Sequence, residues 1–197
     1  MNMMRRQTFS LACGAMVLAS GCLSGCSGLR GDTPEPSINV KQAVKQVDSL
    51  LDGTFKAINP PLKWRDGPAH MSEIKNSFTN TATGEVRVYR HRYVRTELSK
   101  ARLTKLLTVI IEHWKKEGFN ISSANSREPS ISGKSSDGHA VGVSVGGFGD
   151  VEISAYIGAL SDGSSSDIDG EEGDKFPKAP NGGPDYTPDL RDPYWST

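Results

Sequence analysis

The most reactive side chains of this chain are three cysteines near its N-terminus, Cys13, Cys22 and Cys26. No cysteine follows Cys26. A thiolate can act as a nucleophile, as a metal ligand or as half of a disulfide. The rest of the chain is therefore predicted to have no cysteine nucleophile, no thiolate metal site and no internal disulfide. The cysteines must therefore serve the N-terminal segment.

The residues around Cys26 predict that its thiol is acylated. Leu23-Ser24-Gly25-Cys26 matches the bacterial lipobox, in which small residues let a peptidase cut the bond before a lipid-modified cysteine. Ala19-Ser20-Gly21-Cys22 is a poorer match because it lacks the branched aliphatic residue three places before the cysteine. We therefore expect lipidation at Cys26, with Cys22 as the weaker candidate, and residues 1–25 as a lipoprotein signal peptide.

The residues before the lipobox have the pattern of an export signal. Arg5 and Arg6 precede a stretch, from Gln7 to Leu29, without any charge. A membrane-spanning helix, simple secretion and an uncleaved anchor are the alternatives, but glycine and serine make the second half of the stretch too polar to span comfortably. Thr8 fits a twin-arginine signal poorly, so the export route stays open. The predicted location is the extracytoplasmic face of the cell membrane.

Residues that could catalyse a reaction do not form a known constellation. The four histidines, His70, His91, His113 and His139, are far apart, and the chain contains neither an HExxH nor a GxSxG motif. Asp150 and Glu152 flank a predicted turn, where both carboxylates are expected to be solvated and so poorly placed to act as an acid–base pair. We therefore predict no catalytic residue, no cofactor and no metal ligand.

Four arginines in one segment suggest a binding surface. Arg87, Arg90, Arg92 and Arg95 could contact anionic headgroups or an anionic wall polymer, because residues 38–120 hold 15 basic and 8 acidic groups. The alternative is that these arginines pair with carboxylates, including those of the acidic segment 161–174. Nucleic acid is not an expected partner, because the whole chain has a formal net charge of zero and an export signal.

Two amphipathic helices are predicted to position these residues. From residue 38 to 58, apolar side chains recur at helical spacing, and Ser37 or Asn39 can cap the start. Near residues 99–117 a second stripe follows Ser99 and ends at Gly118. Its apolar members are Leu103, Leu106, Leu107, Ile110 and Trp114.

The remaining pattern predicts strands at 85–97, 119–124, 130–135, 139–146 and 150–158. Residues 59–84 are expected to be an irregular connection, with Trp64 and Phe78 as apolar anchors. The expected fold is an α+β two-layer sandwich, with an antiparallel sheet of four to five strands and both helices on one face.

The composition also predicts where the folded domain begins and ends. Residues 26–37 resemble a flexible tether, and 38–160 should form the globular domain. Residues 161–174 carry six acidic groups and no basic group, which predicts a disordered linker, since Phe176 stands where a calcium loop needs its glutamate. Residues 175–197 form a tail rich in proline and aromatic residues, which is expected to dock on the domain itself rather than on another protein.

The lipobox, the sequence EHWKKEGF at 112–119 and the sequence DPYWST at 192–197 resemble small uncharacterised surface lipoproteins of the actinomycete type. This resemblance implies a location in the envelope and supplies no activity. The expected function is a non-catalytic envelope module that binds the membrane, an envelope protein or an anionic polymer. The alternative is a hydrolase of the cell wall or cell periphery.

Overall fold

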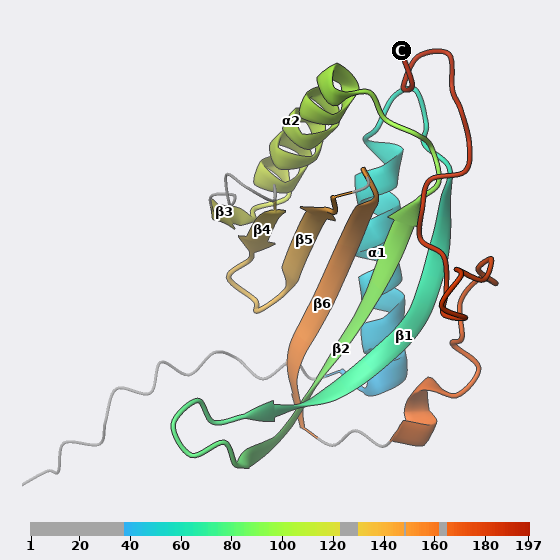
Figure 1. Cartoon of the computed structure of the whole chain (residues 1–197). Coiled ribbons are helices and arrows are strands. Elements are labelled where there is room, and N and C mark those ends of the chain that lie inside the picture. Colours follow the sequence, from blue (N-terminus) through green and yellow to red (C-terminus); the bar gives the residue numbers. More distant parts are fainter. Residues whose placement is uncertain (1–37, 123–129, 148, 162–164) are drawn as a thin grey trace, which may run out of the picture. The chain divides into compact units, whose positions relative to one another are not determined.

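The computed structural model describes residues 38–122, 130–147, 149–161 and 165–197. The sheet order is β1-β2-β6-β5-β4-β3, and every neighbouring pair is antiparallel. The predicted α+β class is therefore confirmed (Figure 1), but the sheet has six strands rather than four to five. The elements are α1 (Val40–Lys56), β1 (Trp64–Lys75), β2 (Ala82–Val94), α2 (Lys100–Lys116), β3 (Asn120–Ser122), β4 (Ser130–Lys134), β5 (Ala140–Val145), β6 (Val151–Ser161) and the short 3-10 helix η1 (Ser165–Ile168).

Both helices begin at side-chain caps. Asn39 accepts a hydrogen bond from the backbone N–H of Gln42, and the Gln42 side chain accepts one from the Asn39 backbone in return. Ser99 caps α2, and Gly118 follows it with φ +87°, a conformation that glycine adopts without strain. The predicted apolar stripe of α1 is buried throughout. In α2, by contrast, Leu103 and Leu107 are only partly buried.

The helices and one face of the sheet enclose a single core. Helix α1 packs against β2 and β6, and α2 packs beside α1 and next to β3. Trp114 of α2 is buried and donates a hydrogen bond from its indole N–H to Thr54 of α1 over 2.9 Å. Alternate strand residues complete the core, as the period of two in a strand requires. They are Val86, Val88, Val94, Ile131, Val141, Val143, Val145, Val151, Ile153, Ala155 and Ile157.

Strand β1 was expected to be part of an irregular connection. Gly67 and Pro68 interrupt its sequence, but in the sheet they coincide with a register shift between Asp66 and Ala69. Proline has no backbone N–H to donate, and it is tolerated here because β1 is the edge strand. The prediction for residues 59–84 is therefore wrong over Trp64–Lys75, and Phe78 in the following turn is 98% exposed rather than an apolar anchor.

The folded domain does not end at residue 160. Trp195 is 1% exposed, belongs to the core and donates a hydrogen bond to the carbonyl of Pro60 over 2.9 Å. The backbone of Leu190 pairs with that of Thr96 and Glu97, just beyond β2. The C-terminal tail is therefore part of the domain. The tail packs on its own domain, which therefore extends beyond the expected boundary at 160.

Residues 165–174 also contact the sheet rather than forming a disordered linker. The backbone N–H of Ala69 donates to the carbonyl of Glu171, and that of Asp174 donates to the carbonyl of Asp66. These bonds occupy backbone groups at the outer edge of β1, where Gly67 and Pro68 disturb the strand. The acidic segment therefore covers part of an otherwise open sheet edge.

Candidate functional site

The four candidate arginines lie on two different faces of the sheet. Because side chains alternate along β2, Arg90 and Arg92 point toward α1, and they are 6% and 5% exposed. Arg87 and Arg95 are on the opposite face of the strand, where Arg87 is exposed and Arg95 is partly buried. The structure therefore does not assemble the predicted cationic patch.

The two buried arginines are paired with carboxylates from three other segments. Arg90 lies 3.1 Å from Asp48 of α1 and 2.5 Å from Glu171. Arg92 lies 2.7 Å from Asp52 of α1 and 2.5 Å from Asp66 of β1. Burial raises the pKa of Asp48, and the nearby Arg90 and Arg92 oppose this rise. Since Glu171 belongs to the acidic segment, the structure supports the alternative that these arginines pair with acidic side chains.

Arg95 is engaged as well, together with Arg65 of β1. Both guanidinium groups reach Asp189 of the C-terminal segment, Arg95 over 2.9 Å and Arg65 over 3.1 Å. Their hydrogen bonds lower the pKa of Asp189 to about 2. Three of the four arginines thus hold the domain together, so anion binding by this set is not supported.

The sheet face turned away from the helices carries a cluster of aromatic rings. His70, Tyr89, His91 and Tyr156 come from β1, β2 and β6, and we call them the aromatic ladder. The ring of Tyr89 stacks on His70 at 5.0 Å and on Tyr156 at 5.5 Å, while His91 meets both tyrosines edge-on. Strand pairing places Tyr89 directly opposite His70 on one side and Tyr156 on the other.

His91 also makes a polar contact on this face, with Glu152 of β6. Its Nδ1 lies 2.6 Å from Oε1 of Glu152, and the two side chains are 19% and 32% exposed. A carboxylate in this position orients the imidazole ring. Burial lowers the pKa of the neighbouring His70, and His91 and Arg90 lower it further.

Beyond Tyr156 the same face is lined with small side chains. Tyr156 pairs with Ala140, Ser154 with Gly142, and Glu152 with Ser144. The rows continue on β4 and β3 through Ser130, Ser132 and Ser122, while the row of Tyr156 and Ala140 continues through Lys134 and Asn120. We call this surface the serine floor, made of Ala140, Gly142, Ser144, Ser130, Ser132 and Ser122. Because these side chains are short, none on β5 can cover the ring of Tyr156.

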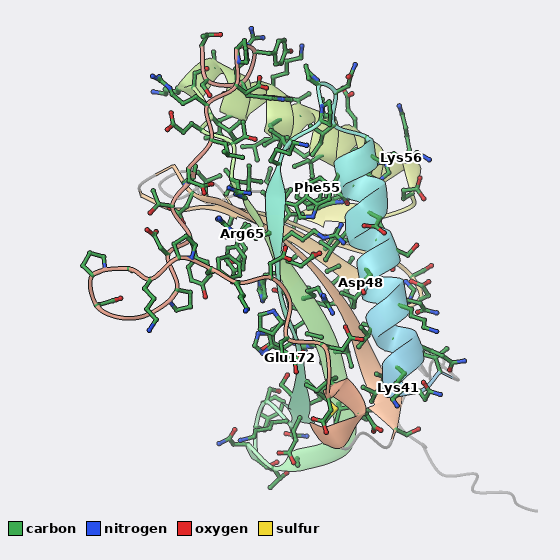
Figure 2. All side chains as sticks on the ribbon, turned by 90° about the vertical axis from the view of Figure 1, so that its right-hand side faces the viewer. Lys41, Asp48, Phe55, Lys56, Arg65 and Glu172 are labelled. Atoms are coloured by element: carbon green, nitrogen blue, oxygen red, sulfur yellow. The ribbon has the colours of Figure 1, made fainter. Side chains whose placement is uncertain are left out.

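The C-terminal segment covers one end of the aromatic ladder. Tyr186 stacks on Tyr93 with ring centroids 4.2 Å apart, and Phe176 meets both rings edge-on. Burial raises the pKa of Tyr93. Figure 2 shows α1 on one side of the sheet and much of the C-terminal segment on the other. The aromatic ladder and the serine floor lie next to this covered end.

The sequence gives only part of this site. The alternation in 85–97 correctly places Tyr89, His91 and Tyr93 on one face, opposite Val86, Val88, Arg90 and Arg92. Nothing in the local pattern brings Tyr156 or Glu152 to them, because that depends on which strand pairs with β2. Glu152 was expected to be solvated, and it is instead half-buried and paired with His91.

Several predicted features lie outside the described residues. The lipidation candidates Cys26 and Cys22 are among them. Within the described ranges, no three histidine or acidic side chains are grouped so that they could hold a metal ion. Neither α1 nor α2 is long and apolar enough to cross a membrane.

Comparison with known proteins does not assign the chain to a family. No protein-family model matches the sequence. No curated protein matches it closely enough to count as a relative.

Proposed function

We propose that this chain is a membrane-anchored extracytoplasmic lipoprotein, held by lipid on Cys26, whose open sheet face binds a polysaccharide strand of the cell envelope without cleaving it. The lipobox and the preceding export signal support the anchor. The resemblance to small actinomycete-type lipoproteins supports the same location.

One observation carries the binding function: the aromatic ladder stands beside the serine floor on a face that the helices leave open. Sugar rings present apolar C–H faces and hydroxyl groups. Aromatic rings and serine hydroxyls can contact these two kinds of surface, and tyrosine offers both an apolar body and a polar tip. Aromatic residues are also enriched among the residues that dominate binding energy.

The charge distribution favours this ligand over an anionic polymer. Arg90, Arg92 and Arg95 are all paired with carboxylates, so they are not available to neutralise a polyanion. The open face carries charges of both signs, Glu152 of β6, Lys134 of β4 and Arg87 of β2, so it is not a uniformly cationic surface. Such a mixed surface is better suited to an uncharged or weakly charged glycan than to a polyanion.

A second candidate function, hydrolysis, rests on the pair formed by His91 and Glu152. A histidine oriented by a carboxylate can act as a general base. The nearest serine in the strand pairing is Ser154, opposite His91, but it is 6% exposed and its hydroxyl donates to the carbonyl of Gly142. Cleavage of a glycosidic bond ordinarily needs two carboxyl groups that flank it, and the ladder is paired with one, Glu152, so binding is the better supported function.

The binding function is tested by sedimenting the purified protein with insoluble cell-wall glycan. Removing one ring with Tyr156→Ala should weaken binding about tenfold, since loss of an interface aromatic costs more than about 1 kcal/mol. Phe78→Ala is the control, because it removes an exposed ring outside this face. Equal binding by the wild type and Tyr156→Ala would contradict the proposal.

The two candidate functions give different results in the same samples. If the protein is a binding module, the wild type releases no new reducing ends from the glycan. Release of reducing ends that His91→Ala abolishes would support the hydrolase instead. Mass spectrometry of the mature N-terminus tests the anchor separately, and a cysteine without acyl mass would contradict it.

A further inference from the structure

Phe78 lies at the tip of the turn between β1 and β2 and is 98% exposed. A single exposed apolar residue is common on protein surfaces and needs no explanation by itself. The position of this residue is less common, because the β1–β2 turn extends beyond the end of the neighbouring strand β6. The pairing of β2 with β6 ends at Glu85, whereas β2 continues to Ala82 alongside β1 alone.

The turn holds Phe78 in a defined place. The side-chain oxygen of Asn76 accepts hydrogen bonds from the backbone N–H groups of Phe78 and Thr79, over 2.9 and 3.2 Å. The backbone N–H of Asn76 donates to the carbonyl of Thr81, and Asn80 has φ +53°. Such a bonded turn presents its aromatic side chain with little loss of entropy on binding.

The tip is also free of charge. Residues 76–84 contain no acidic or basic group, and the first charged neighbours are Lys75 and Glu85. An uncharged tip with one aromatic ring suits the interface of a lipid bilayer, where phenylalanine side chains insert and charged ones are costly to insert. A protein partner is less favoured, because hot spots cluster with other anchors, and here one ring stands alone.

The tip lies at the same end of the domain as the start of α1. Figures 1 and 2 share a vertical axis, and in both views the β1–β2 turn and the Lys41 end of α1 are at the bottom. The chain between the lipidation site and the described domain is short. The 12 residues from Cys26 to 37 span at most about 43 Å, since an extended chain covers up to ~3.6 Å per residue.

We propose that the β1–β2 turn is a second membrane contact, in which Phe78 enters the interface of the bilayer to which the lipid on Cys26 holds the chain. This inference rests on the proposed lipid anchor. Two contacts at one end fix the orientation of the domain. Tyr89 lies seven residues beyond the start of β2, about 23 Å along the strand at ~3.3 Å per residue. The aromatic ladder is thereby kept clear of the bilayer and open to the envelope.

The test places a fluorophore beside Phe78 and measures its contact with lipid. Ser77→Cys is introduced into the full-length chain, labelled with NBD after purification from membranes, and reconstituted in vesicles of phosphatidylethanolamine and phosphatidylglycerol. The proposed acylation blocks Cys26, and signal removal takes away Cys13 and Cys22, so the label is unique. Lys56→Cys, at the opposite end of α1, is the matched control (Figure 2).

The expected result is a blue shift and quenching by doxyl-labelled lipid at position 77 but not at position 56. Adding Phe78→Ser to the Ser77→Cys chain should reduce the quenching at least about twofold, because the ring is the group that enters the interface. Equal quenching at 77 and 56 in acylated, vesicle-bound protein would contradict the membrane contact of Phe78 and leave the lipid anchor standing. Loss of both the acyl mass and flotation with vesicles would overturn the anchor and the contact together.

Discussion

At the scale of single residues, Arg90 and Arg92 show why only part of the candidate site could be predicted. The alternation along β2 correctly predicts that Arg90 and Arg92 share a face with valines. It does not predict whether that face is buried or exposed to solvent. Arginine is rarely buried without a partner. The structure buries both residues because Asp48, Asp52, Asp66 and Glu171 converge on them from α1, β1 and the acidic segment.

Asp189 provides a prediction about pH. Its folded-state pKa is about 2, below its ordinary value of 3.8, so its ionised form stabilises the fold. This stabilisation is present above pH ~4 and is lost as the pH falls toward 2. Asp189→Asn should lower the free energy of unfolding at pH 7 by about 1 kcal/mol, because solvent screens a side chain that is 37% exposed.

Urea denaturation at pH 7 and at steps down to pH 3 measures this difference. The gap between the wild type and Asp189→Asn should shrink as the pH falls, because the wild type then loses the same ionised form. Glu172→Gln is a suitable control, since this exposed carboxylate is not the partner of Arg65 or Arg95. A gap that stays constant down to pH 3 would mean that Asp189 acts through packing rather than charge.

At the scale of elements, the sequence predicts best where one local period dominates. The stripe of α1 and the hairpin of β5 and β6 follow from periods of 3.6 and 2, and the structure confirms both. Strand β1 could not be predicted this way, since Gly67 and Pro68 suggest a turn. Only the edge position of β1 and its bulge make a strand possible there. In α2, Leu107 matches the stripe but is only partly buried, because β3 and α1 cover a narrower face than the pattern implies.

The C-terminal segment is a structural element whose removal should be costly. Trp195→Ala should lower the free energy of unfolding by about 3–5 kcal/mol, because it empties a fully buried site and leaves the Pro60 carbonyl without its indole donor. Thermal unfolding followed by circular dichroism measures the loss. Phe78→Ala is the control and should cost far less, since the ring of Phe78 is 98% exposed. Equal losses for the two variants would contradict the role of Trp195 in the core.

At the scale of the whole domain, the helices close one face of the sheet and leave the other open. The C-terminal segment covers this open face near Tyr93, through Tyr186 and Phe176, and at Arg65 and Arg95, through Asp189. The binding face could not be predicted from the sequence, because it combines residues from all six strands, and among them His70 and Tyr156 are 86 positions apart. Their proximity follows from the sheet order, in which β2 pairs with the distant β6.

Filling the serine floor is the most direct test of the proposed binding function. Ser144 is exposed on the floor, and Ser144→Trp adds bulk there without removing a core contact. Ser136→Trp, in the exposed turn between β4 and β5, adds the same bulk outside the floor. Sedimentation with cell-wall glycan should show binding by the wild type and Ser136→Trp, and binding at least about tenfold weaker for Ser144→Trp. Unchanged binding by a folded Ser144→Trp protein would contradict the claim that this face holds the ligand.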